Sequence, residues 1–117
     1  MSVTPGFQYV IVWEFRVKAG REAEFVEKYG PEGVWARFFR RSEGYIRTEL
    51  VNDVTDRLRF LTLDYWRSHE DFNWFREMFQ REYERFTQLV TDEGIIERQR
   101  VVGSFYIDDS DLGLVST

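Results

Sequence analysis

The chain has 117 residues, of which 43% are hydrophobic and 32% charged, and its formal net charge is −5. This balance predicts one folded, soluble domain and excludes both a disordered chain and a membrane-crossing helix, because no apolar run approaches the roughly 20 residues that a bilayer requires. The acidic charge disfavours nucleic-acid binding. The lack of cysteine and of a secretory signal predicts a cytoplasmic protein.

The first half of the chain reads as strand, helix, helix and strand. Every odd position of residues 7–17 is apolar, which predicts a strand with one face of large side chains. Residues 22–29 follow helical spacing and end at Gly30 and Pro31. Pro31 is expected in the first turn of a second helix that reaches Arg41, and a second strand follows over residues 45–51.

The second half reads as strand, long helix and strand. A hairpin loop leads to a third strand over residues 57–66. Ser68 is expected to cap one long helix that runs to Gly94, because apolar residues recur there at spacings of three and four. The last strand is expected over residues 95–107, with Val101, Gly103, Phe105 and Ile107 on one face.

A single domain accounts for the whole chain, residues 1–117, with a core at about 7–107 and an acidic tail over 108–117. The element order predicts an α+β fold of the ferredoxin-like βαββαβ type, a four-stranded antiparallel sheet with helices on one face. We therefore expect the other face of the sheet to lie open.

That open face is expected to be apolar, although an antiparallel sheet facing water carries polar residues. Its predicted members are Val10, Val12, Val51, Leu61, Leu63 and Tyr65. A second copy of the chain is the simplest cover for such a patch, so we expect a homodimer through the open sheet face. The alternative, a covering segment of the same chain, has only the short polar tail to draw on.

Three stretches are similar to one known family. They are FRVKAGREAEF (residues 15–25), GYIRTEL (44–50) and YWRSHEDFNWF (65–75). Over residues 7–105 the chain resembles the antibiotic biosynthesis monooxygenase family of dimeric α/β barrels. The resemblance implies a barrel shared by two subunits, each with a pocket between its sheet and its helices. It also implies one of two activities, cofactor-independent oxidation of aromatic polyketides or haem degradation.

The haem-degrading branch of this family is disfavoured by the residues present. That branch has a histidine on the long helix and an asparagine on the first strand, whereas this chain has Trp13 on the strand and no histidine over residues 70–91. His69, the only histidine, is expected to be a solvated residue of the first helical turn rather than a ligand or base. With one histidine and no cysteine, we expect neither a metal site nor a cofactor.

Asp64 is the candidate catalytic base. By strand parity it shares a face with Phe60 and Trp66, so a carboxylate would lie in an apolar pocket with a raised pKa. Thr48 and Thr62 would supply hydrogen bonds. The alternative is that Asp64 pairs with an arginine or caps a backbone group, since buried carboxylates usually have partners.

The remaining candidates are large aromatic residues. Trp66 matches the family's pocket tryptophan, which stands at the same place before the serine, although it could equally be a core residue. Trp13, Tyr29, Trp35 and Tyr45 would complete the pocket, and each is also explicable as core.

Three functions remain open at this stage. One is a cofactor-independent monooxygenase acting on a small aromatic or polyketide-like substrate, and another is a polyketide cyclase or isomerase that uses the same pocket. The third is a non-enzymatic dimeric barrel that binds a small apolar or aromatic ligand or serves as an accessory protein. The sequence has no phosphate-binding glycine loop and no dinucleotide motif, which fits all three.

Overall fold

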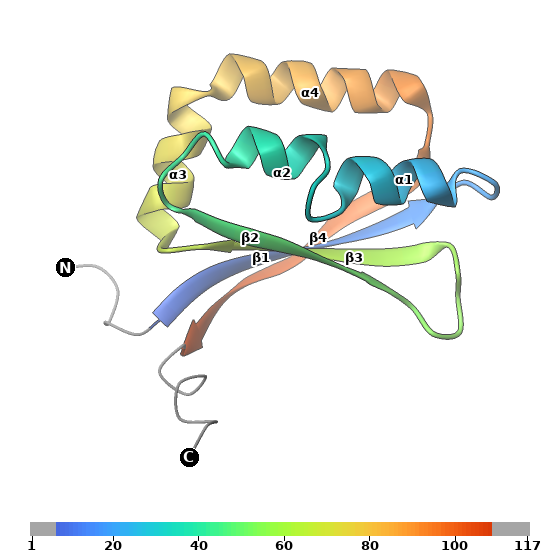
Figure 1. The fold of residues 1–117 in the computed structure, drawn as a ribbon, viewed down its shortest axis with the longest axis horizontal. Helices are drawn as coiled ribbons and strands as arrows, with labels where there is room; N and C mark the ends of the chain where they lie inside the picture. The colour runs from blue at the N-terminus through green and yellow to red at the C-terminus, as the bar shows by residue number, and fades with distance from the viewer. Residues whose placement is uncertain (1–6, 109–117) are drawn as a thin grey trace.

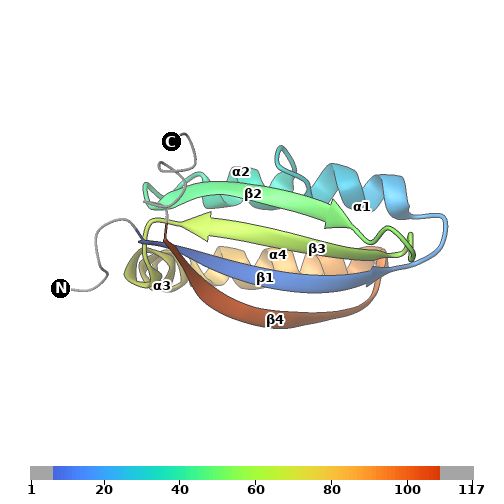
Figure 2. The same ribbon diagram turned by 90° about the horizontal axis from the view of Figure 1, so that it is seen from below.

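Residues 7–108, which the computed structural model describes, form one antiparallel sheet with helices on a single face (Figure 1). Seen from the open side, the strands lie in the order β2-β3-β1-β4 (Figure 2). The strands are β1 (Phe7–Val17), β2 (Tyr45–Asn52), β3 (Arg59–Trp66) and β4 (Ile96–Asp108), and the helices are α1 (Glu22–Tyr29), α2 (Val34–Phe39), α3 (His69–Met78) and α4 (Gln80–Glu93). The predicted ferredoxin-like α+β fold is confirmed.

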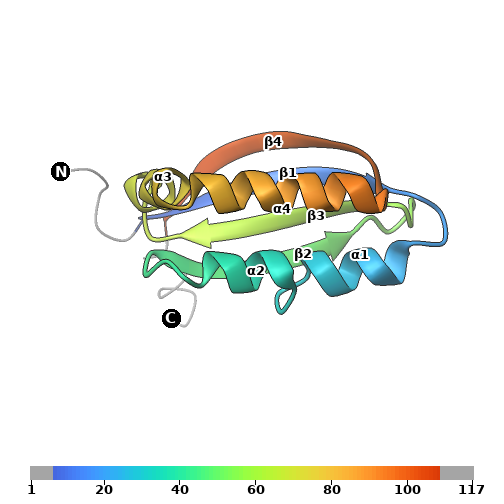
Figure 3. The same cartoon turned by 90° about the horizontal axis from the view of Figure 1, so that it is seen from above.

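The helices divide the covered face of the sheet between them. Figure 3 shows α1 and α2 above the β2 side of the sheet, whereas α4 runs along the sheet beside them. The odd residues of β1 point into this layer, as predicted, and Tyr9, Ile11 and Phe15 are buried there. The layer between sheet and helices is therefore the place where a pocket can form.

Two groups of buried residues fill most of this layer. The α1-side cluster consists of Phe15, Val17, Phe25, Tyr29, Phe60, Val90 and Ile95. The α3-side cluster consists of Tyr9, Ile11, Phe38, Phe39, Trp66 and Phe75. Trp13 and Trp35 pack against both clusters, so they stand at the boundary between them.

The predicted long helix is wrong, because the chain forms two helices that meet at Phe79. This residue ends α3 and begins α4 with φ −113° and ψ 31°. Its ring packs against Phe75, with ring centroids 5.1 Å apart, and the guanidinium of Arg41 lies 4.6 Å above it. The bend lets α3 turn away and cover the end of the sheet while α4 follows the strands (Figure 1). The bend contains neither proline nor glycine, and the apolar residues keep their helical spacing through it. The sequence therefore gives no sign that the helix is broken at Phe79.

The second helix also begins later than predicted. Pro31 lies in a turn, and α2 starts after Gly33, whose N–H donates to the carbonyl of Gly30 at 2.9 Å. A Cβ atom at position 33 would lie 2.2 Å from the carbonyl oxygen of Lys28, so only glycine fits this tight turn. The helix ends at Phe39 rather than at Arg41, with Arg40 as its last capping residue.

The face assignment of β4 is wrong for part of the strand. Val12 pairs with Gly103 but Trp13 pairs with Val101, so Val102 is an extra residue that forms a β-bulge. The bulge places Val101 on the helix side with Trp13. Gly103, Phe105 and Ile107 face the open side instead.

Two further predictions concern the acidic tail and membrane-crossing helices, and the structure describes only residues 7–108. Of the predicted acidic tail, Asp108 is the last residue of β4, and 109–117 lie outside the described residues. Across the part of the chain that the structure describes, no helix is long and apolar enough to cross a membrane.

Candidate functional site

A cavity of about 440 Å³ lies between the sheet and the helices, a size typical of small-molecule sites. Trp13, Thr48, Thr62 and Asp64 line it from the sheet, and Tyr29 and Trp35 line it from the α1 and α2 side. The remaining lining residues are Phe15, Phe39, Arg76, Tyr83, Thr87, Val90, Thr91, Ile96, Glu97, Arg98 and Gln99. The cavity therefore has aromatic walls and a polar patch on β2 and β3.

Asp64 is the buried acid of this polar patch. Only 8% of the residue is exposed, and burial raises the pKa of its carboxyl from 3.8 to about 6. The Thr48 hydroxyl donates to Oδ1 at 2.7 Å, which opposes that rise. Within residues 7–108, no arginine, lysine or backbone N–H pairs with this carboxylate. The carboxylate is therefore held by a hydroxyl rather than neutralised by a cation.

Thr48 connects Asp64 to a third residue, Tyr45. Thr48 and Asp64 are directly paired on β2 and β3, and the phenol oxygen of Tyr45 lies 2.6 Å from Thr48 Oγ1. Because the Thr48 hydroxyl has one proton and donates it to Asp64, the Tyr45 phenol is the donor of the second bond. Burial raises the pKa of Tyr45, which keeps this phenol protonated. The chain of hydroxyls thus orients the carboxylate and stabilises its charged form.

The structure brings most of the predicted pocket residues together. Trp13, Tyr29, Trp35, Thr48, Thr62 and Asp64 all line the one cavity. Tyr45 and Trp66 do not line it. Tyr45 reaches the site only through Thr48, so its predicted place in the pocket wall is corrected to a supporting position behind it.

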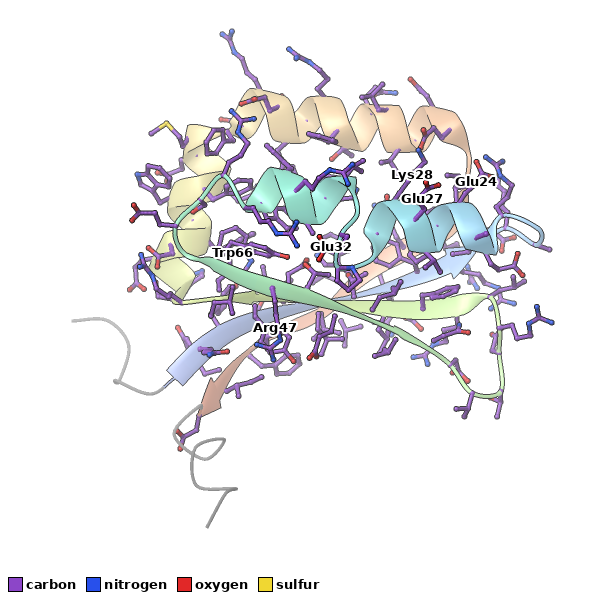
Figure 4. The ribbon with its side chains drawn as sticks, in the orientation of Figure 1. Glu24, Glu27, Lys28, Glu32, Arg47 and Trp66 are labelled. Atoms are coloured by element: carbon purple, nitrogen blue, oxygen red, sulfur yellow. The ribbon has the colours of Figure 1, made fainter. Side chains whose placement is uncertain are left out.

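Trp66 belongs to the core rather than to the cavity wall. It is fully buried, and the rings of Phe39, Phe72 and Phe75 lie with centroids 5.3 to 5.5 Å from its own. Figure 4 shows it rising from β3 into the layer beneath the helices. These contacts fill the space around the indole, so the core interpretation of Trp66 describes its position.

Sequence reasoning missed the wall that α3 and α4 contribute. Arg76 lies on α3, and Tyr83, Thr87 and Val90 lie on α4. Their spacings of seven, four and three residues are those of one side of a helix, but the apolar members of such a stripe are ordinarily core residues. Residues 96–99 of β4 gave no signal, because an edge strand next to a cavity is polar, as it is next to water.

His69 lies away from the cavity. It is the first residue of α3, it is exposed, and its Nε2 lies 3.2 Å from the side-chain nitrogen of Asn73. Across residues 7–108, no group of three or more histidine, cysteine or acidic side chains is arranged to hold a metal ion.

The sequence profile of the antibiotic biosynthesis monooxygenase family matches residues 8–89, which is most of the chain. The chain therefore belongs to the antibiotic biosynthesis monooxygenase family. The match includes Asp64, Thr48 and the helical cavity residues up to Thr87, and it ends within α4, before Val90 and Thr91. No curated protein matches the sequence.

Several solved structures share the fold at low sequence identity. SnoaB, a cofactor-independent oxygenase from Streptomyces nogalater, is 23% identical with a TM-score of 0.60, covering 84% of this chain and 90% of SnoaB. A protein from Shewanella oneidensis is 18% identical with a TM-score of 0.58, covering 87% and 92% of the two chains. PA3566 from Pseudomonas aeruginosa is 12% identical with a TM-score of 0.60, covering 90% and 98%. At these identities the likeness concerns the fold.

Proposed function

We propose that this protein is a cofactor-independent monooxygenase that acts on a small hydroxylated aromatic or polyketide-like compound. The observation that carries the proposal is Asp64, a buried carboxylate with no cationic partner in the described chain and with a pKa of about 6, facing an aromatic cavity. A base with such a pKa is largely ionised at neutral pH and still strong enough to take a proton from an acidic phenol or enol.

The proposed reaction needs only the substrate and molecular oxygen. Asp64 removes the phenolic proton, and the resulting phenolate transfers electrons to oxygen, which bonds to a ring carbon. Loss of water from the hydroperoxide leaves a quinone, so that a phenol and one O₂ give one quinone and one H₂O. The substrate is oxidised by four electrons, and these reduce the two oxygen atoms of O₂. The protein contributes the base, the orientation and a cavity that excludes water.

Two further observations support this assignment over the other candidate functions. The chain belongs to a family named for monooxygenase activity, and SnoaB, which shares the fold, is described as a cofactor-independent oxygenase. The cavity walls of Trp13, Tyr29, Trp35 and Tyr83 are suited to a flat ring system. A cyclase or isomerase would use the same base without consuming oxygen, and a binding protein would not need the base.

Oxygen consumption with a hydroxylated naphthalene or anthrone as substrate tests the proposal. The wild-type protein should consume one O₂ per quinone formed. Asp64→Asn should lower the turnover number by a factor of about 10² or more, the usual contribution of a general base. Glu97→Gln is the matched control, because it removes a carboxylate from the cavity rim that is bonded to Arg16. Equal loss in both variants, or full activity in Asp64→Asn, would reject Asp64 as the base.

We also propose that a second copy of the chain covers the open sheet face. Across the strands, Phe105, Val10 and Tyr65 form one row, and Val12 and Leu63 belong to the next. Phe105 is 49% exposed and Val12 and Leu63 are half-buried, whereas Val10 and Tyr65 are already buried by their neighbours. Phe105 lies against Gly103, where a Cβ atom would meet its ring at 2.9 Å. The exposed apolar part of this face, which none of the described helices covers, favours association.

Polar residues border this apolar surface on the β2 side. Arg47 projects from β2 to the open side (Figure 4), with its guanidinium 3.9 Å above the Tyr65 ring. The Tyr65 hydroxyl donates to Glu49 at 2.9 Å. An apolar centre with a polar border is the composition that protein interfaces commonly have.

Sedimentation at micromolar concentration tests the association. The wild-type protein should sediment as two copies, and Leu63→Lys should sediment as one, because a lysine would be buried in the contact. Leu89→Lys is the control, since Leu89 is 55% exposed on α4, away from the sheet. A wild-type protein that stays a single copy would contradict the proposed dimer.

A further inference from the structure

The cavity carries one cationic side chain, that of Arg76, which no acid of the described chain neutralises. Arg76 lines the cavity and has no carboxylate oxygen within 4.0 Å in the part of the chain that the structure describes. Arg98 also borders the cavity, but it pairs with Arg16 of β1, so its side chain faces the open side of the sheet. Arginines elsewhere are commonly paired, as Arg41 is with Glu82 at 2.6 Å. Glu97, the acid on the cavity rim, is already bonded to Arg16 at 3.6 Å. Arg76 is therefore the unpaired cation of the cavity wall, in a chain whose net charge is −5.

Arg76 is held in place by aromatic rings. Its guanidinium carbon lies 4.0 Å above the ring of Tyr83 and 5.9 Å from that of Phe72. Tyr83 also lines the cavity, and its ring meets that of Trp35 edge to face at 5.4 Å. A guanidinium stacked on a ring keeps its N–H groups free in its own plane, where they can bind a carboxylate through two parallel hydrogen bonds.

Arg76 and Asp64 act on a common part of the cavity. The pKa of Tyr83 is raised chiefly by burial, and it is lowered by the charge of Arg76 and raised by that of Asp64. Both charges therefore lie near the Tyr83 phenol. A ring placed against Tyr83 would have a cation and a base within its reach.

We infer that the cavity selects an aromatic compound that carries a carboxylate, with Arg76 as the residue that binds the carboxylate. The inference deepens the proposed function, because it assigns the substrate an anionic group and rests on Asp64 acting at the hydroxyl group of the same molecule. A neutral ring of the same size would gain the aromatic contacts but leave the guanidinium unpaired.

The test compares binding of 1-hydroxy-2-naphthoic acid with binding of its methyl ester, followed by calorimetry at pH 7.5. The wild-type protein should bind the acid tenfold or more tightly, about what one charge-assisted pair contributes, and added salt should reduce that preference. Arg76→Gln should bring the two affinities to within about twofold while leaving ester binding unchanged. Arg85→Gln is the matched control, because Arg85 is an exposed arginine of α4 outside the cavity lining.

Each outcome decides between the inferences. Equal affinity of the wild type for acid and ester, or an unchanged preference in Arg76→Gln, overturns the role of Arg76. Binding requires no turnover, so the oxygenase proposal is tested separately. A preference for the acid without oxygen consumption would leave the anion site standing and reject the oxygenase. Oxygen consumption with acid and ester at equal affinity would do the reverse.

Discussion

Asp64 and Trp66 lie two residues apart on the same face of β3, yet their surroundings differ in kind. Trp66 is enclosed by the rings of the α3-side cluster, whereas Asp64 faces a cavity beside the α1-side cluster. The bend at Phe79 accounts for the difference, because it brings α3 down onto the end of the sheet and leaves α4 to roof the cavity. The aromatic residues thus fill one end of the layer and form walls at the other.

The largest effect on stability should follow from removing a buried ring from the α3-side cluster. Trp66→Ala removes a fully buried indole from closely packed rings, and we expect it to lower the free energy of unfolding by about 3–5 kcal/mol. Trp74→Ala is the matched control on α3, since Trp74 is 50% exposed and its loss should cost less than about 1 kcal/mol. Urea unfolding measures both. Similar values for the two variants would show that the end near α3 is not tightly packed.

At the cavity end of the layer, Asp64 should make the stability depend on pH with the opposite sign from an ordinary carboxylate. Asp64 has a pKa of 3.8 in the unfolded chain and about 6 when folded. Its contribution to the free energy of unfolding is therefore complete below pH 3.8, the pKa in the unfolded chain. That contribution is lost as the pH rises to about 6, a change of about 3 kcal/mol. Relative to wild type, Asp64→Asn should gain about 2 kcal/mol of stability between pH 4.5 and 7.5.

Comparing the two proteins at each pH cancels the contributions of the other carboxyl groups. Asp53, whose pKa is lowered to about 2 chiefly by hydrogen bonds from Thr55, would by itself act in the opposite direction. Urea unfolding at both pH values gives the difference directly. A gap between variant and wild type that does not change with pH would show that Asp64 titrates normally.

A smaller effect is expected from the Thr48 hydroxyl, which links Asp64 at the cavity to Tyr45 beside the α3-side cluster. Thr48→Val removes the hydrogen bond to Asp64 and leaves Tyr45 without its acceptor, at a cost of about 1 kcal/mol. Because that bond favours the charged carboxylate, its loss should move the pH midpoint of oxygenase activity upward. A pH–rate profile measures the shift. An unchanged midpoint would mean that Thr48 does not set the ionisation of the base.

The sequence predicted the parts of the fold that depend on side-chain periodicity. The eleven residues of β1 and the face shared by Asp64 and Trp66 followed from alternation, and the structure has both. The bend at Phe79 did not follow, because it arises from contacts with Arg41 and Phe75, which sequence spacing does not reveal.

The candidate site was predicted on the sheet and on α1 and α2, and it was missed on α3 and α4. Asp64, Thr48 and Thr62 stand out as polar residues at positions where the alternation expects apolar ones. Arg76 gives no such contrast, because an arginine on a helix is ordinary and its role depends on the ring of Tyr83 across the bend. A polar residue among apolar neighbours is visible in a sequence, but a pairing between two helices is not.

The extra residue at Val102 has a consequence for comparing β4 with other proteins. Because it exchanges the two sides of the strand, residues 98–101 follow one alternation and residues 103–108 begin another. A relative whose last strand is regular would therefore align correctly with only one of these halves unless a gap is placed at 102. Equivalent positions in this strand are those whose side chains face the same side of the sheet. An alignment by residue number alone would match residues at the cavity rim with residues on the outer surface.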